Sequence, residues 1–159
     1  IMQCLLDGGL SIARTQTQAD ITILADAAHP DVPRIFDSTA HVHPHVHLGI
    51  LGARATVGPV VVPGRSSCLR CTHLHRTDAD ARWPLLAAQW SHYEPWRADP
   101  LLATLAIAHA VVVTRAYLDD PSGALPLLNR AWEITLPRGT IVERARPPHP
   151  LCGCDWLAA

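Results

Sequence analysis

The sequence contains no lysine, and all thirteen of its basic residues are arginines. This absence excludes chemistry that needs a lysine amine, such as Schiff-base formation or the phosphate contact made by the lysine of a P-loop. Net charge is scarce as well, because the formal net charge is −1 and the isoelectric point is about 6.8. The sequence therefore offers no basic surface for DNA, RNA or an anionic membrane.

Long hydrophobic runs are also missing. The longest, residues 101–113, is interrupted by His109 and is shorter than the ~20 residues that span a bilayer. The first nine residues, IMQCLLDGG, lack the charged segment and long apolar core of a secretory signal. We therefore expect a cytoplasmic protein, in which paired cysteines bind metal more often than they form disulfides. Because Ile1 lies part-way into an apolar segment, we also expect the chain to be a fragment of a longer protein.

The apolar and charged fractions of the 159 residues, 48% and 17%, are typical of one globular domain. β-Branched apolar runs predict a buried, parallel strand, two further strands, and a late hairpin. These segments are residues 21–27, 45–53, 55–64, and the pair 130–136 and 139–145. Within the third strand, Gly58-Pro59 is expected to kink or begin the strand, and Pro63-Gly64 to end it. The pattern indicates an α/β domain with a mixed sheet.

Helices are expected between these strands. Residues 3–9 are typical of a helix end with Gly8-Gly9 as its cap, and residues 30–40 of one or two helical turns. Residues 77–96 indicate short surface helices. Asp99 and Pro100 are typical of the first positions of a helix, here spanning residues 100–118. That helix is apolar on nearly every face, which predicts a place in the core or under a subunit interface.

HVHPHVH, residues 41–47, places a histidine at every second position. On a strand these side chains would line one face, roughly 6.6–7 Å apart. Pro44 interrupts the run, no acidic or cysteine ligand lies within it, and a line of ligands does not converge on zinc. We therefore interpret the run as polar, partly exposed histidines at the start of a strand.

Two close pairs of cysteines form a stronger pattern: Cys68 and Cys71 in SSCLRC, and Cys152 and Cys154 in LCGC. A Cys-x-x-Cys turn with a second close pair elsewhere predicts a closed, tetrahedral zinc site with four thiolate ligands. Such a site has no open position for water, so its role would be structural, and metal binding would contribute directly to folding. Cys4 stands apart and is interpreted as an ordinary buried thiol.

Other interpretations of the cysteines remain open. Cys68 and Cys71 could form a redox pair at the start of a helix, although this leaves the second pair unexplained. Because Cys-x-Cys is tighter than Cys-x-x-Cys, one ligand could instead be a histidine, namely His73, His75 or His149. We also weigh a metalloenzyme that uses the histidine run, whose metal would keep an open coordination position.

The segment GPVVVPGRSSCLRCTHLHRTDADARWPLLAAQW (58–90) resembles the ThiF-like, ubiquitin-activating-enzyme-related proteins that accompany YcaO cyclodehydratases in making thiazole/oxazole-modified peptides. ADITILAD upstream is similar to the second half of the ThiF-like Rossmann domain, and HPLCGC (149–154) to the family's second zinc pair. The resemblance implies that residues 1–159 are a single partial ThiF-like domain, Rossmann-like and α/β, lacking the N-terminal nucleotide-binding half. It further implies structural zinc at the cysteines and frequently a homodimer.

Catalysis is not implied by the resemblance. Adenylating relatives carry a Gly-rich loop and a lysine, whereas this sequence has no G-x-G-x-x-G and no lysine. We therefore expect a zinc-binding scaffold, not catalytic on its own, that assists a YcaO-type cyclodehydratase and its precursor peptide. The alternative is a fragment of an ATP-dependent adenylyltransferase, with Asp26 at a strand end as a remnant of its site. Arg76 and Asp78 in LHRTD are interpreted as structural.

Overall fold

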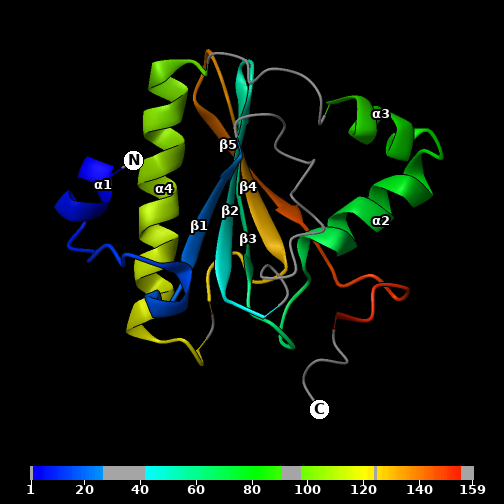
Figure 1. Cartoon of the computed structure of the whole chain (residues 1–159). Coiled ribbons are helices and arrows are strands. Elements are labelled where there is room, and N and C mark those ends of the chain that lie inside the picture. The colour runs from blue at the N-terminus through cyan, green and yellow to red at the C-terminus, as the bar shows by residue number, and fades with distance from the viewer. Residues whose placement is uncertain (1, 27–41, 91–97, 124, 155–159) are drawn as a thin grey trace.

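The computed structural model describes residues 2–26, 42–90, 98–123 and 125–154 (Figure 1). Along the described chain, one helix and a short 3-10 turn at Gln16–Gln18 precede three strands, and three further helices separate these from the last two strands of the same sheet. The helices are α1 (Met2–Asp7), α2 (Leu69–Ala79), α3 (Trp83–Trp90) and α4 (Pro100–Asp119). The strands are β1 (Thr22–Asp26), β2 (His45–Leu51), β3 (Arg54–Val61), β4 (Arg130–Thr135) and β5 (Thr140–Ala145).

The sheet is mixed, as the sequence predicts. Its five described strands lie in chain order, β1 to β5; β1 pairs with β2 in parallel and every later pair is antiparallel. Gly58 and Pro59 fall where the β2–β3 register slips between Leu48↔Val57 and Val46↔Val60, which confirms the expected kink. The strand ends at Val61, slightly before the Pro63-Gly64 turn.

Strand β1 differs from expectation in its burial. It is parallel, as predicted, but its side chains from Thr22 to Leu24 are only half-buried and Ala25 is exposed. The reason is its position, because β1 is the edge strand of the described sheet and pairs there only with β2. A parallel strand is usually covered on both sides and both faces.

Helices lie on both sides of the sheet (Figure 1), with α1 and α4 on one side and α2 and α3 on the other. Helix α4 closes the main core against β2 and β3 through Leu102, Ala106, Ala110 and Val113, all completely buried. Gly8 lies against Val111, so α1 packs on the flank of α4. Successive residues of a strand face opposite sides, so Val46 and Leu48 join this core while His45 and His47 lie on the side of the sheet that carries α2 and α3.

The caps of α4 are those that the sequence predicts. The Asp99 carboxylate accepts hydrogen bonds from the backbone N–H groups of Leu101 and Leu102, at 2.8 and 3.1 Å, and Pro100 is the first helical residue. The helix has 20 residues, which is longer than the apolar run of residues 101–113. By length and composition alone it could cross a membrane. Its packing on the sheet is that of a core helix, with the opposite face apolar and exposed.

The remaining expectations have mixed outcomes. Helix α1 ends at Asp7, followed by Gly9 at φ 77°, and the β4–β5 hairpin turns at residues 136–139, as predicted. Short helices between 77 and 96 are confirmed for α3, and α2 begins earlier than expected, at Leu69. The helical turns expected at 30–40 lie outside the described residues, as do residues 91–97, His41 and the side chain of Asp26.

Candidate metal centre

The first pair of cysteines is placed by the loop between β3 and α2. Its backbone is held by two side chains: Ser66 Oγ accepts from the Val62 N–H at 2.8 Å, and Asn129 Oδ1 accepts from the Ser67 N–H at 2.6 Å. Cys68 is then the N-cap residue of α2, and Cys71 lies one turn into the helix. Both cysteines cluster with Val61 of β3, and Cys71 is completely buried.

The second pair comes from the chain that follows β5. His149 C=O accepts a hydrogen bond from the Cys152 N–H at 2.9 Å, which turns the chain back on itself. Gly153 has φ 71°, a conformation that glycine adopts without strain. This conformation lets the thiols of Cys152 and Cys154, on either side of Gly153, face the same way. Cys152 and Cys154 are both 8% exposed.

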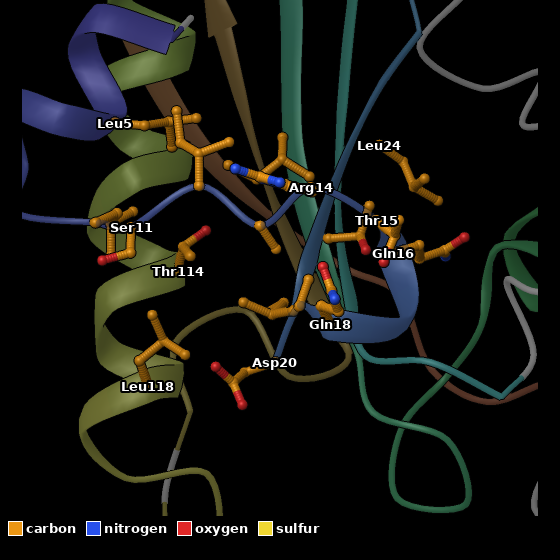
Figure 2. A pocket seen from close by; sticks show the side chains of 17 residues that line it. Leu5, Ser11, Arg14, Thr15, Gln16, Gln18, Asp20, Leu24, Thr114 and Leu118 are labelled. Atoms are coloured by element: carbon orange, nitrogen blue, oxygen red, sulfur yellow. The ribbon is translucent and has the colours of Figure 1, made fainter.

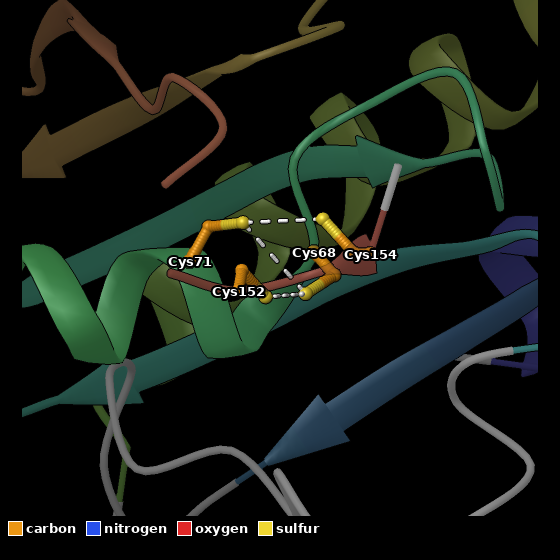
Figure 3. Close-up of side chains that lie close together, drawn as sticks. All are labelled: Cys68, Cys71, Cys152 and Cys154. Carbon is orange, nitrogen blue, oxygen red and sulfur yellow. Dashed lines mark hydrogen bonds between the residues drawn. The ribbon is translucent and has the colours of Figure 1, made fainter. Parts of the chain in front are cut away.

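The four sulfur atoms of these pairs lie together (Figure 3). The Sγ atoms of Cys68 and Cys152 are 3.4 Å apart, those of Cys71 and Cys154 3.4 Å, and those of Cys68 and Cys71 3.9 Å. Zinc–sulfur bonds of about 2.3 Å in a tetrahedron require sulfurs about 3.8 Å apart. All five cysteines of the chain are free thiols, so no disulfide explains the cluster. The residues present therefore fit a four-thiolate metal ion.

The electrostatics of the cluster favour one thiolate even without a metal. The hydrogen bond from Cys68 lowers the pKa of Cys71 to about 4, although burial opposes this. Donating that hydrogen bond raises the pKa of Cys68, while burial raises the pKa of Cys152 and Cys154. A divalent cation would replace the remaining thiol protons, so metal binding here must release protons.

The positions of these residues bear on several of the sequence interpretations. The redox interpretation placed Cys68 and Cys71 at a helix start, which is correct, but each sulfur is closer to one of the second pair than to its neighbour in sequence. No histidine is needed to complete the four sulfurs. Cys4 is half-buried on α1 rather than buried, because α1 covers only the flank of α4.

The histidine run was partly misjudged. Strand β2 begins at His45, as expected, but His45 and His47 are 1% and 3% exposed rather than partly exposed. Strand β2 lies inside the sheet between β1 and β3, and helices lie on both faces of the sheet, so its side chains are covered whichever face they point from. Among the described residues, two groups bring metal-ligating atoms together, and neither includes a histidine of the run.

The sequence did not reveal the role of Asp78 and His149. His149 Nε2 lies 2.8 Å from Asp78 Oδ2, and these two residues with His75 form the second group of potential ligands. Asp78 and His149 are 71 positions apart, and no spacing rule connects them. Arg76, in the same LHRTD segment, has its guanidinium 4.6 Å from the centre of the Trp83 ring, consistent with a structural role.

A hollow of about 680 Å³ lies between α4 and β1 (Figure 2). Leu5, Leu118 and Thr114 line it on the helical side, and Arg14 and Asp20 lie on the segment that crosses it. Its volume is in the range of small-molecule sites. However, its described lining contains no cysteine, histidine or lysine, so the cysteine cluster remains the stronger functional candidate.

No protein-family model and no curated protein matches the chain, whereas solved structures share its fold. A heterocyclase in complex with substrate and cofactor has a TM-score of 0.66 and 16% identity, covering 97% of this chain and 22% of its own. E. coli MccB with ATP has a TM-score of 0.57 and 19% identity, and the match covers 86% of this chain and 39% of the MccB chain. The microcin C7 biosynthetic enzyme MccB in complex with N-formylated MccA has a TM-score of 0.59 and 17% identity. That match covers 92% of this chain and 45% of the MccB chain.

The likeness shows a shared fold. The chain spans less than half the length of each of these proteins. At identities below 20% the comparison carries no site residue from one protein to the other.

Proposed function

We propose that Cys68, Cys71, Cys152 and Cys154 bind one structural zinc ion. The observation that carries this proposal is the convergence of four buried sulfurs from two segments about 80 residues apart, at the spacing of a tetrahedron. With all four positions filled by sulfur, the ion would stabilise the fold rather than activate water. Elemental analysis should find one zinc per chain, and four thiols should resist a thiol reagent until a chelator is added. Fewer than four protected thiols would contradict the assignment.

We further propose that the domain is a non-catalytic scaffold in the biosynthesis of azole-modified peptides, assisting a YcaO-type cyclodehydratase. The support is the resemblance of residues 58–90, together with the fold shared with a heterocyclase and with a microcin biosynthetic enzyme. A reconstituted reaction of a YcaO-type enzyme and its precursor peptide from the same genome tests it. Adding the protein should increase the rate of water loss from the peptide, measured by mass spectrometry. An unchanged rate at saturating protein contradicts the scaffold role.

The second candidate is a part of an ATP-dependent adenylyltransferase. The observation in its favour is the fold shared with MccB, which has been solved with ATP. Because these 159 residues contain neither a lysine nor G-x-G-x-x-G, this candidate requires a nucleotide-binding half outside them. ATP–pyrophosphate exchange separates the two candidates, because enzyme-like exchange by the purified protein favours the second and excludes the first.

We also propose a homodimer formed through the outer face of α4. Leu101, Leu105 and Val112 line that face and are 72%, 39% and 58% exposed, with the small Ala108 between them. Two copies crossing in antiparallel at Ala108 would bury these side chains and bring Arg115 of each copy near Asp99 of the other. Sedimentation should show a dimer at micromolar concentration that Val112→Asp dissociates. Ile141→Asp on exposed β5 is the control and should leave the dimer intact.

A further inference from the structure

The C-terminal arm, residues 146–154, is fastened to the domain by contacts that do not involve cysteine sulfur. The Arg146 N–H donates to Asn129 C=O at 2.7 Å, and the Arg146 guanidinium pairs with Glu133 at 3.2 Å. The Pro147 C=O lies 3.2 Å from His75 Nε2 on α2. These bonds hold the first part of the arm against β4 and α2 before the chain reaches Cys152.

His149 makes the last of these attachments and the most buried one. Its side chain is 4% exposed, its Nδ1 accepts from the Leu151 N–H at 3.1 Å, and its C=O accepts from the Cys152 N–H at 2.9 Å. An imidazole nitrogen that accepts a hydrogen bond carries no proton, so the ring proton lies on Nε2 and is donated to Asp78 at 2.8 Å. His149 thereby links Asp78 on α2 to Cys152: its side chain bonds to Asp78 and its backbone C=O bonds to the Cys152 N–H.

This geometry argues against a second metal ion at His75, Asp78 and His149, although their potential ligand atoms lie within 4.8 Å of one another. A metal at His149 Nε2 would need that nitrogen deprotonated and Nδ1 protonated, and Nδ1 would then face the Leu151 N–H with no lone pair to accept it. The arrangement suits a hydrogen-bonded clamp and not a coordination sphere.

We propose that Asp78 and His149 form a metal-independent clamp that docks the Cys-x-Cys arm on α2 and gathers the four sulfurs before a metal binds. The inference rests on the proposed zinc site, and both residues are positioning residues rather than ligands. Metal then enters a nearly formed site and need not order the arm. Loss of the clamp weakens metal binding because the arm must be ordered at the moment of binding.

The metal-binding experiment measures zinc affinity by competition with a chromophoric chelator. Asp78→Ala and His149→Ala should each weaken zinc binding by about 10- to 100-fold, the usual effect of losing a supporting hydrogen bond around a metal site. Asp78→Asn keeps an oxygen acceptor for His149 and should bind within about threefold of the unaltered protein. Asp80→Asn removes a charge two residues away and is the matched control. The Asp78 side chain is 67% exposed, so its substitution leaves the core intact.

A second readout is independent of the metal. In the metal-free, reduced protein, amide exchange by NMR should show the Leu151 and Cys152 N–H groups protected, and His149→Ala should remove that protection. Unprotected amides in the metal-free protein, or unchanged affinity in both alanine variants, would overturn the clamp. The clamp would also be overturned if the protein bound two zinc ions per chain and the His75→Ala variant bound only one. If the protein bound no zinc at all, the zinc proposal would fail, and amide exchange in the metal-free protein would still test whether Asp78 and His149 hold the arm.

Discussion

Replacing Cys71 by serine should remove about a quarter of the metal's contribution to stability while leaving the metal-free fold nearly unchanged. Cys71 is completely buried and lies 3.9 and 3.4 Å from two other sulfurs, and a hydroxyl fills almost the same volume. Structural zinc sites bind with apparent free energies of about 10–16 kcal/mol, so one of four ligands accounts for about 2.5–4 kcal/mol. This corresponds to a roughly 100- to 1,000-fold weaker affinity.

Stability follows affinity, because a ligand that binds only the folded state stabilises it in proportion to the logarithm of its affinity. For a domain of this size, each 1 kcal/mol changes Tm by about 2–4 °C, so zinc-loaded Cys71→Ser should unfold roughly 5–15 °C below the zinc-loaded protein. Differential scanning fluorimetry with and without a chelator measures this. The chelator should lower the Tm of both proteins, and that of the unaltered protein by roughly 5–15 °C more than that of the variant. Cys4→Ser is the control, because Cys4 lies on α1, outside the cluster.

The zinc reasoning is refuted if Cys71→Ser and Cys4→Ser have the same Tm in saturating zinc. It is also refuted if the chelator leaves the Tm of the unaltered protein in place, since a closed site of four buried thiolates cannot be lost without a measurable change in stability.

Three further predictions concern the fold. Leu102→Ala leaves a cavity at a completely buried position of α4 and should lower the free energy of unfolding by about 2–5 kcal/mol in urea titrations; less than 1 kcal/mol would contradict the core described here. Asp99→Ala removes two hydrogen bonds at the start of α4 and should cost about 1 kcal/mol by the same assay, with Asp99→Asn retaining most of it. Burial, with the nearby Asp20 carboxylate, raises the pKa of Tyr117 above 10. The folded protein then keeps a proton that the unfolded chain loses, so the contribution of Tyr117 to stability should be constant below pH 10 and fall as pH rises further; Tyr117→Phe should flatten that decline in pH-dependent denaturation.

The elements of the fold are largely readable from the sequence because their causes are local. Asp99 and Pro100 specify the start of α4, and the φ > 0 position at Gly9 follows the end of α1. The kink at Gly58-Pro59 follows from the missing N–H of proline. The burial of His45 and His47 was misjudged because it depends on β2 being an interior strand of a sheet with helices on both faces, which no local pattern states.

The candidate site divides in the same way. The spacing Cys-x-x-Cys and Cys-x-Cys by itself determined that four thiols come in two close pairs, because one turn of chain sets the distance within each pair. Only the tertiary structure decided that the pairs meet, since that requires α2 and the arm after β5 to be brought together on one side of the sheet. The Asp78–His149 hydrogen bond is decided wholly by the tertiary structure, because its two side chains are 71 residues apart in the sequence and come within bonding distance only when the chain folds.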